Sequence, residues 1–176
     1  MNKTTILSFH YLFLLRWIGV IGISFVCPFL FSHYQIPLGI LINAMLFFSV
    51  MRLGKYEQMS VILLPNLAVL MRGILFGQLT MYLLYFTPFI WVGNWLLTYM
   101  YSRLQQRHGF FISSIIAGIT KSAFLFCVAY ICIFYRIVPM PFLFSMGYMQ
   151  CVTSLGGAFV AYMVMRVAYD SSHRRI

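Results

Sequence analysis

Acidic residues are nearly absent from this sequence: Glu57 and Asp170 stand against twelve lysines and arginines, which leaves a formal net charge of +10. Charged residues make up only 8% of the chain, whereas a water-soluble domain usually has about 25%. So little charge cannot coat a surface in water, and the 62% of hydrophobic residues indicates that lipid is the solvent. The cations fall at the ends of apolar runs and form no basic stripe, so we expect membrane lipid and not nucleic acid as a partner.

The sequence also lacks the sets of residues that metal, cofactor and enzyme chemistry require. Its four cysteines form no C-x-x-C pair, and no histidine lies near them at ligand spacing. Its four histidines lie at the ends of apolar runs or between them, where they cannot face each other as haem ligands. No nucleotide loop, H-E-x-x-H or G-x-S-x-G motif occurs, and no acid lies within an apolar run. We therefore expect no enzyme activity, no metal and no cofactor.

Long apolar runs are abundant. A helix needs about 20 mainly apolar residues to cross a bilayer, and its backbone must form its hydrogen bonds within the segment. The runs therefore predict an all-α protein, a single domain over residues 1–176 that forms a six-helix transmembrane bundle. The predicted spans are 11–31, 37–51, 59–77, 81–101, 109–135 and 142–165. Small residues spaced four apart, such as Ser114 with Gly118 and Gly157 with Ala161, predict close helix contacts in the last two spans.

The positions of the cations predict the orientation, because lysine and arginine gather on the cytoplasmic side of membrane proteins. With both ends in the cytoplasm, the outer loops keep Arg136 as their clear cation. The cations on the inner side are then Lys3, Arg52, Lys55, Arg103, Arg107, Arg166, Arg174 and Arg175. We therefore expect a multi-pass protein of the cell membrane (inner or plasma membrane), N-in and C-in.

Two cations are predicted to lie deep in the membrane, and such residues are functional candidates. Lys121 lies about 12 residues into the fifth span, which at about 1.5 Å per residue is close to the midplane. Arg72 lies in the third span, nearer the outer side, whereas Arg16 is close enough to the inner surface to extend its side chain there.

No carboxylate lies in a span to neutralise Arg72 and Lys121, so another arrangement must stabilise them. Lys121 could be neutral, or it could bond to the carbonyls of a broken helix. Both cations could instead face a polar cavity that accepts an anionic or carboxylate-bearing ligand. A purely structural role, or a lipid headgroup site, is the alternative explanation.

Uncharged polar side chains also lie in the spans, where amides most often hold helices together. They are Asn43, Asn66, Gln78, Asn94, Gln150 and Thr153. Asn94, Gln150 and Thr153 belong to spans four and six, which can flank Lys121. The predicted substrate-binding residues are therefore Arg72, Asn94, Lys121, Gln150 and Thr153.

Two stretches carry a resemblance to a known family. "LPNLAVLMRGILFGQLTMYLLYFTPFIWVGNWL" (64–97) resembles the middle of the S components, the substrate-binding subunits of energy-coupling-factor (ECF) transporters, and of their uncharacterised relatives. "PMPFLFSMGYMQCVTSLGGAFVAY" (139–162) is similar to their last span. The resemblance implies a six-helix bundle that binds a vitamin or metal ion near the outer side. It also implies import by toppling in the membrane, driven by a transmembrane coupling subunit and a pair of ATPases. By location, Arg72, Asn94, Lys121 and Gln150 would be polar members of the family's pocket.

The first span departs from this family. It has no alanine, whereas the family's first span often carries an alanine-xxx-alanine surface that docks on the coupling subunit. The start Met1-Asn2-Lys3 also lacks the histidine of the metal-importing members. We expect an S-component-like protein that binds a small, anionic or carboxylate-bearing solute for ATP-driven uptake. The alternative is a non-transport anchor or assembly subunit of a larger complex, for example an electron-transfer complex.

Overall fold

The computed structural model describes the backbone of residues 3–75 and 77–173, and the side chains of residues 15, 17–75, 77 and 79–167. Within these residues the chain forms helices and no strand, which confirms the all-α prediction. The elements are α1 (Lys3–Phe31), α2 (Gln35–Arg52), α3 (Lys55–Arg72), the 3₁₀ helix η1 (Gly77–Tyr82), α4 (Leu83–Phe134), α5 (Pro141–Met146) and α6 (Tyr148–His173).

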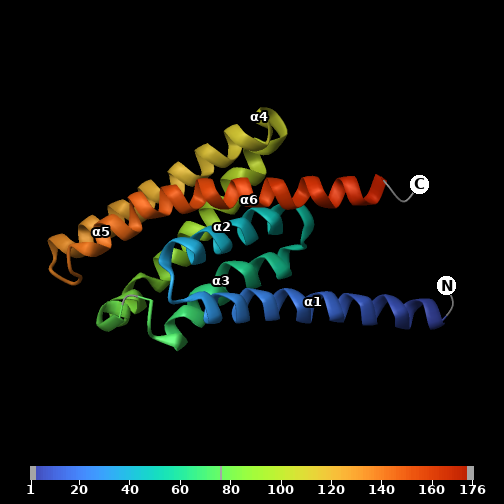
Figure 1. Ribbon diagram of the computed structural model, residues 1–176, viewed down its shortest axis with the longest axis horizontal. Helices are drawn as coiled ribbons and strands as arrows, with labels where there is room; N and C mark the ends of the chain where they lie inside the picture. Colours follow the sequence, from blue (N-terminus) through green and yellow to red (C-terminus); the bar gives the residue numbers. More distant parts are fainter. Residues whose placement is uncertain (1–2, 76, 174–176) are drawn as a thin grey trace.

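Three helical stretches are long and apolar enough to cross a membrane, in the part of the chain that the structure describes. They are Gln35–Arg52, Leu79–Phe134 and Pro141–Val167, and Trp17–Phe31 is a shorter apolar helix. Helices α1 and α6 run along the length of the molecule, with α2 and α3 between them (Figure 1). Large apolar side chains such as Ile18, Leu84 and Phe134 are exposed on the outside, as expected for a protein whose solvent is lipid.

Helix α4 consists of two segments that meet at Gly109. Its 52 residues include one non-helical position, where Gly109 has φ 71° and ψ −179°. The chain reverses its direction within α4 (Figure 1), so the two segments run in opposite directions. The sequence predicted a new span at Gly109, but it left 102–108 as a connection that the structure shows to be helical. Only glycine adopts this backbone conformation readily, because it has no Cβ.

Replacing Gly109 by alanine is therefore expected to lower the free energy of unfolding by about 1–3 kcal/mol. A Cβ at Gly109 meets no atom within 4 Å, so the backbone alone carries this effect. Gly19→Ala is the matched control, because Gly19 also has open space around it but lies within α1. Thermal unfolding of the two variants in detergent measures the difference. Equal melting temperatures would contradict a special role for the backbone at Gly109.

Two other predicted boundaries differ from the structure. The third span was predicted to reach residue 77, but α3 ends at Arg72, where Gly73 adopts the left-handed conformation (φ 71°) that terminates helices. The last span was predicted as one run over 142–165, but Gly147 separates the short α5 from α6. Arg72 is consequently the last residue of its helix and does not lie within a continuing span.

The ends of the helices that carry most of the predicted inner cations lie together. In Figure 1 the start of α1, the end of α6, the α2–α3 connection and the reversal within α4 all lie toward the right. The connections α1–α2 and α4–α5 lie toward the left, together with η1. Arg52 and Lys55 flank the α2–α3 connection, and Arg103 and Arg107 precede the reversal at Gly109.

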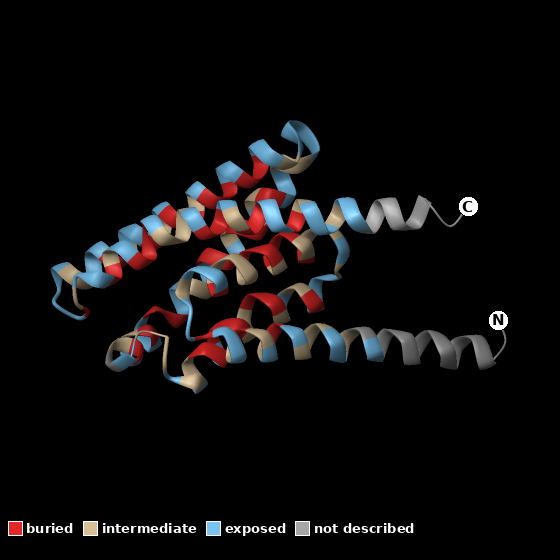
Figure 2. Ribbon diagram, viewed as in Figure 1, coloured by how far each residue is buried: buried red, intermediate tan, exposed pale blue. Residues whose placement is uncertain are grey.

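The buried residues form two separate apolar clusters, and they line the faces that the helices turn toward each other (Figure 2). The first cluster is built from Leu38, Val69, Leu83, Phe86, Leu125, Ala129, Val138, Phe142 and Met146. The second is built from Leu46, Phe47, Val61, Ile62, Leu97, Tyr101, Ala117, Ala158 and Ala161. Along α2, α3 and each of the two segments of α4, the two clusters are separated by a short interval that contains polar residues.

Candidate functional site: a polar layer around Lys121

Buried polar residues occupy the interval between the two apolar clusters. Five of them come from five different helical segments, and we call these five the polar layer: Asn43 (α2), Asn66 (α3), Asn94 (first segment of α4), Lys121 (second segment of α4) and Thr153 (α6). Lys121 and Asn94 are each only 2% exposed. Asn94, Lys121 and Thr153 belong to the predicted substrate-binding set, whereas Asn43 and Asn66 were predicted only to hold helices together.

Hydrogen bonds connect three members of the polar layer across three helical segments. The Nζ atom of Lys121 donates to Oδ1 of Asn43 at 2.8 Å. Nδ2 of Asn43 donates to the Gly39 carbonyl at 2.9 Å and to Oγ1 of Thr153 at 3.2 Å. The Thr153 hydroxyl in turn donates to the carbonyl of Gln150 at 3.3 Å. Asn43 therefore uses both its donors and its acceptor, and it orients Lys121.

Glycines allow α2 and α6 to approach closely enough for the Asn43–Thr153 bond. A Cβ added at Gly157 would lie 2.6 Å from Cβ of Asn43 and 2.7 Å from the backbone nitrogen of Ala44. A Cβ at Gly39 would lie 2.7 Å from a side-chain atom of Thr153. The predicted small-residue contacts of the last span therefore exist, and they set the position of Thr153 against Asn43.

The orientation of Asn94 is fixed by the turn of α3 that precedes Pro65. Pro65 has no N–H, so the helical hydrogen bond to the carbonyl four residues earlier, that of Val61, is missing. Two side chains of α4 donate to carbonyls in that turn: Trp91 Nε1 to Leu63 at 3.1 Å, and Asn94 Nδ2 to Ile62 at 3.3 Å. Because Nδ2 is committed to α3, the other amide atom of Asn94 must be its oxygen. This Oδ1 is buried and has no hydrogen-bond partner.

The polar layer opens into a cavity of about 80 Å³. Its polar lining residues are Gln35, Asn43, Asn66, Asn94, Lys121 and Gln150. The side chain of Asn66 is bonded to Thr87, with Nδ2 donating to Oγ1 at 2.9 Å. The cavity is large enough for several waters or a solute of a few heavy atoms, and smaller than the roughly 150 Å³ cavity that holds benzene in an engineered protein.

Arg72 is not brought together with the other four predicted residues. Its guanidinium lies 4.9 Å from the centre of the Phe29 ring, and Nη2 lies 3.5 Å from Nε2 of His33. Both partners belong to the end of α1 or the turn after it, so Arg72 joins α3 to α1. It does not line the cavity around Lys121. Gln78, also singled out from the sequence, lies outside the described side chains, as does Arg16.

Glu57, the one acid with a described side chain, does not pair with Lys121 but caps the start of α3. Glu57 Oε2 accepts a hydrogen bond from the backbone nitrogen of Gly54 at 2.7 Å. A carboxylate in the first turn of a helix satisfies unpaired N–H groups and is stabilised by the helix dipole. Among the described residues, Lys121 forms no ion pair with a carboxylate, and its hydrogen bond goes to the neutral Asn43. The polar layer therefore contains one basic side chain and no acid.

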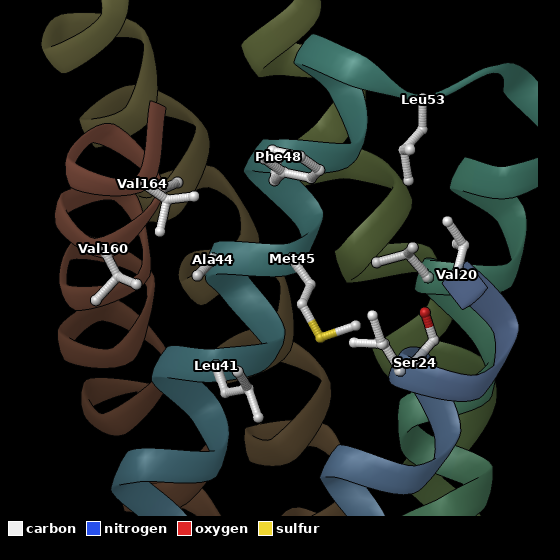
Figure 3. A pocket seen from close by; sticks show the side chains of 12 residues that line it. Val20, Ser24, Leu41, Ala44, Met45, Phe48, Leu53, Val160 and Val164 are labelled. Atoms are coloured by element: carbon white, nitrogen blue, oxygen red, sulfur yellow. The ribbon is translucent and has the colours of Figure 1, made fainter. Parts of the chain in front are cut away.

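A second hollow of the molecule has a different chemistry. It has a volume of about 260 Å³ and is lined by residues of α1, α2, α3, α6 and the α2–α3 connection, among them Val20, Met45, Phe48 and Val164 (Figure 3). Its one polar lining residue is Ser24, whose hydroxyl has no partner. A lining of this kind suits hydrocarbon and offers no charge to an anion.

No protein-family model matches this chain, and no curated protein or solved structure shows a significant similarity to it. The fold and the site therefore define its class by themselves: an all-helical protein with helices long and apolar enough to cross a membrane, and a buried polar layer at the centre.

The arrangement can bind a small polar molecule without covalent chemistry. A charged lysine offers three hydrogen-bond donors. Among the described residues, Lys121 uses one of them, in its bond to Asn43. Asn94 lines the same cavity, and its Oδ1 has no hydrogen-bond partner. Three polar residues that line the cavity were missing from the predicted site: Gln35, Asn43 and Asn66. A signal for Asn43 existed, because an amide between apolar residues must have partners, but its register against Lys121 depends on tertiary packing.

Proposed function

We propose that the chain is a multi-pass protein of the cell membrane, N-in and C-in, whose polar layer binds a small anionic solute for uptake. In this proposal α1, α2, α3, the two segments of α4, and α6 are its six spans. Lys121 supplies the charge that attracts the solute, and a separate energising module of coupling subunit and ATPases drives transport, as in the S components that two stretches resemble.

The burial of Lys121 without a carboxylate partner is the observation that carries this proposal. Burying a charged group without a counter-charge is destabilising, so such residues inside membrane-length helices usually have a functional role. A cavity lined by Lys121 and by Asn94, whose Oδ1 has no hydrogen-bond partner, supports a bound solute over a purely structural lysine. The cavity volume favours a solute of a few heavy atoms over one as large as a vitamin.

Affinity purification of the tagged protein from its native membranes in mild detergent tests the transport part of this proposal. Mass spectrometry is expected to identify a transmembrane coupling subunit together with two ATPases. A purification from the same membranes with an unrelated tagged protein of six spans is the control. Recovery of redox or assembly subunits, with no ATPase, would contradict the proposal and support the anchor function instead.

A further inference from the structure

We infer that the solute bound by the polar layer is a small monocarboxylate that also carries a neutral hydroxyl or amide donor. This inference rests on the proposed function and adds the chemical class of the solute. It depends on which groups of the cavity wall are already bonded and which are not.

The first step concerns charge. Lys121 is the one cationic group among the residues that line the cavity, and no acid lines it. A ligand with a single negative charge therefore balances the site. A second negative charge would be buried without a counter-charge, and so would the ammonium group of an amino acid, because no carboxylate lines the cavity.

The second step concerns the remaining donors of Lys121. Its Nζ donates to Asn43 Oδ1, and no other hydrogen bond of this atom occurs among the described residues. A carboxylate provides two acceptor oxygens, which suit an ammonium group with donors to spare. Asn43 has no amide donor left for the carboxylate, because Gly39 and Thr153 already occupy both.

The third step concerns Asn94. Its Nδ2 is held by the Ile62 carbonyl, so its unpaired Oδ1 is an acceptor and not a donor. A simple carboxylate has no hydrogen to offer this oxygen and would leave it unpaired, which is unfavourable in a buried site. A hydroxyl or amide N–H on the ligand satisfies it. Hydroxy acids and amido acids of small size have both features, and the cavity of about 80 Å³ limits the rest of the molecule.

Titration calorimetry with the purified full-length protein in lipid nanodiscs tests this inference, with glycolate, acetate and glycine as matched probes. We expect glycolate to bind at least about ten-fold more tightly than acetate. Glycine, which places an ammonium where glycolate has its hydroxyl, is expected to bind less tightly than either. Asn94→Leu is expected to remove the difference between glycolate and acetate.

The outcomes separate the inference from the proposed function. Equal affinities of the wild-type protein for glycolate and acetate would overturn the inference and leave an anion site in place. No binding of either acid to folded protein, with only water filling the cavity, would overturn both. If Asn94→Leu does not fold, the comparison of the two acids in the wild-type protein decides by itself.

Discussion

Replacing Lys121 by methionine is expected to leave the protein folded and to abolish the binding of small carboxylates. Methionine has a similar length and is apolar, so it can fill the space between the two apolar clusters. Removing one partner of a buried, charged contact costs about 2–5 kcal/mol of binding free energy, which corresponds to a loss of affinity of about 30-fold or more. Calorimetry with acetate measures the loss, and the melting temperature in detergent reports the fold.

Arg72→Met is the matched control for this experiment. It also removes one cation from the part of the chain predicted to be in the membrane, but Arg72 contacts Phe29 and His33 instead of the cavity. Acetate binding is therefore expected to stay within about two-fold of the wild-type value, which is less than about 0.5 kcal/mol. If the arginine variant loses binding and the lysine variant keeps it, the assignment of the site to the polar layer is wrong.

Replacing Gly157 by alanine is expected to lower the free energy of unfolding by about 1–3 kcal/mol, because the added methyl group has no space. It would meet the backbone of α2 at Asn43 and Ala44, and backbone atoms cannot turn aside as the end of a side chain can. The variant separates α2 from α6, so it should also weaken the bond between Asn43 and Thr153.

Gly22→Ala is the control for the Gly157 variant. Gly22 lies within α1, and a Cβ there meets no atom within 4 Å, so alanine should stabilise its helix by about 0.5–1 kcal/mol. The two substitutions are chemically identical and are expected to shift the melting temperature in opposite directions. A Gly157 variant as stable as the Gly22 variant would show that α2 and α6 are not in close contact.

The positions of the helices could be predicted because a lipid environment requires a simple sequence pattern. A membrane-crossing segment needs a long apolar run, and every helix with such a run lies close to its predicted place. The helix ends were predicted less well, since hydropathy reports lipid contact and not helical structure. The polar residues 102–108 continue α4 although their composition suggested a loop, and Gly73 ends α3 five residues before the apolar run does.

The candidate site could be predicted in part. Asn94, Lys121 and Gln150 line one cavity, and Thr153 joins them through Asn43. Arg72 was grouped with them because the predicted third span placed it inside the membrane, whereas α3 ends at that residue. The partner of Lys121 was not predictable, because the contact with Asn43 joins residues 78 positions apart. That register depends on glycines whose packing neighbours are unknown until the chain is folded.

The position of Lys121, midway between two apolar clusters, has an electrical consequence for a protein with the proposed function. An anion that travels from either membrane surface to this lysine crosses about half of the membrane potential, which amounts to about 1 kcal/mol for each 100 mV. An empty site leaves a unit positive charge at this depth, and an occupied site leaves none. The voltage across the membrane would thus bias the balance between the empty and the loaded protein, in a direction set by the side from which the anion enters.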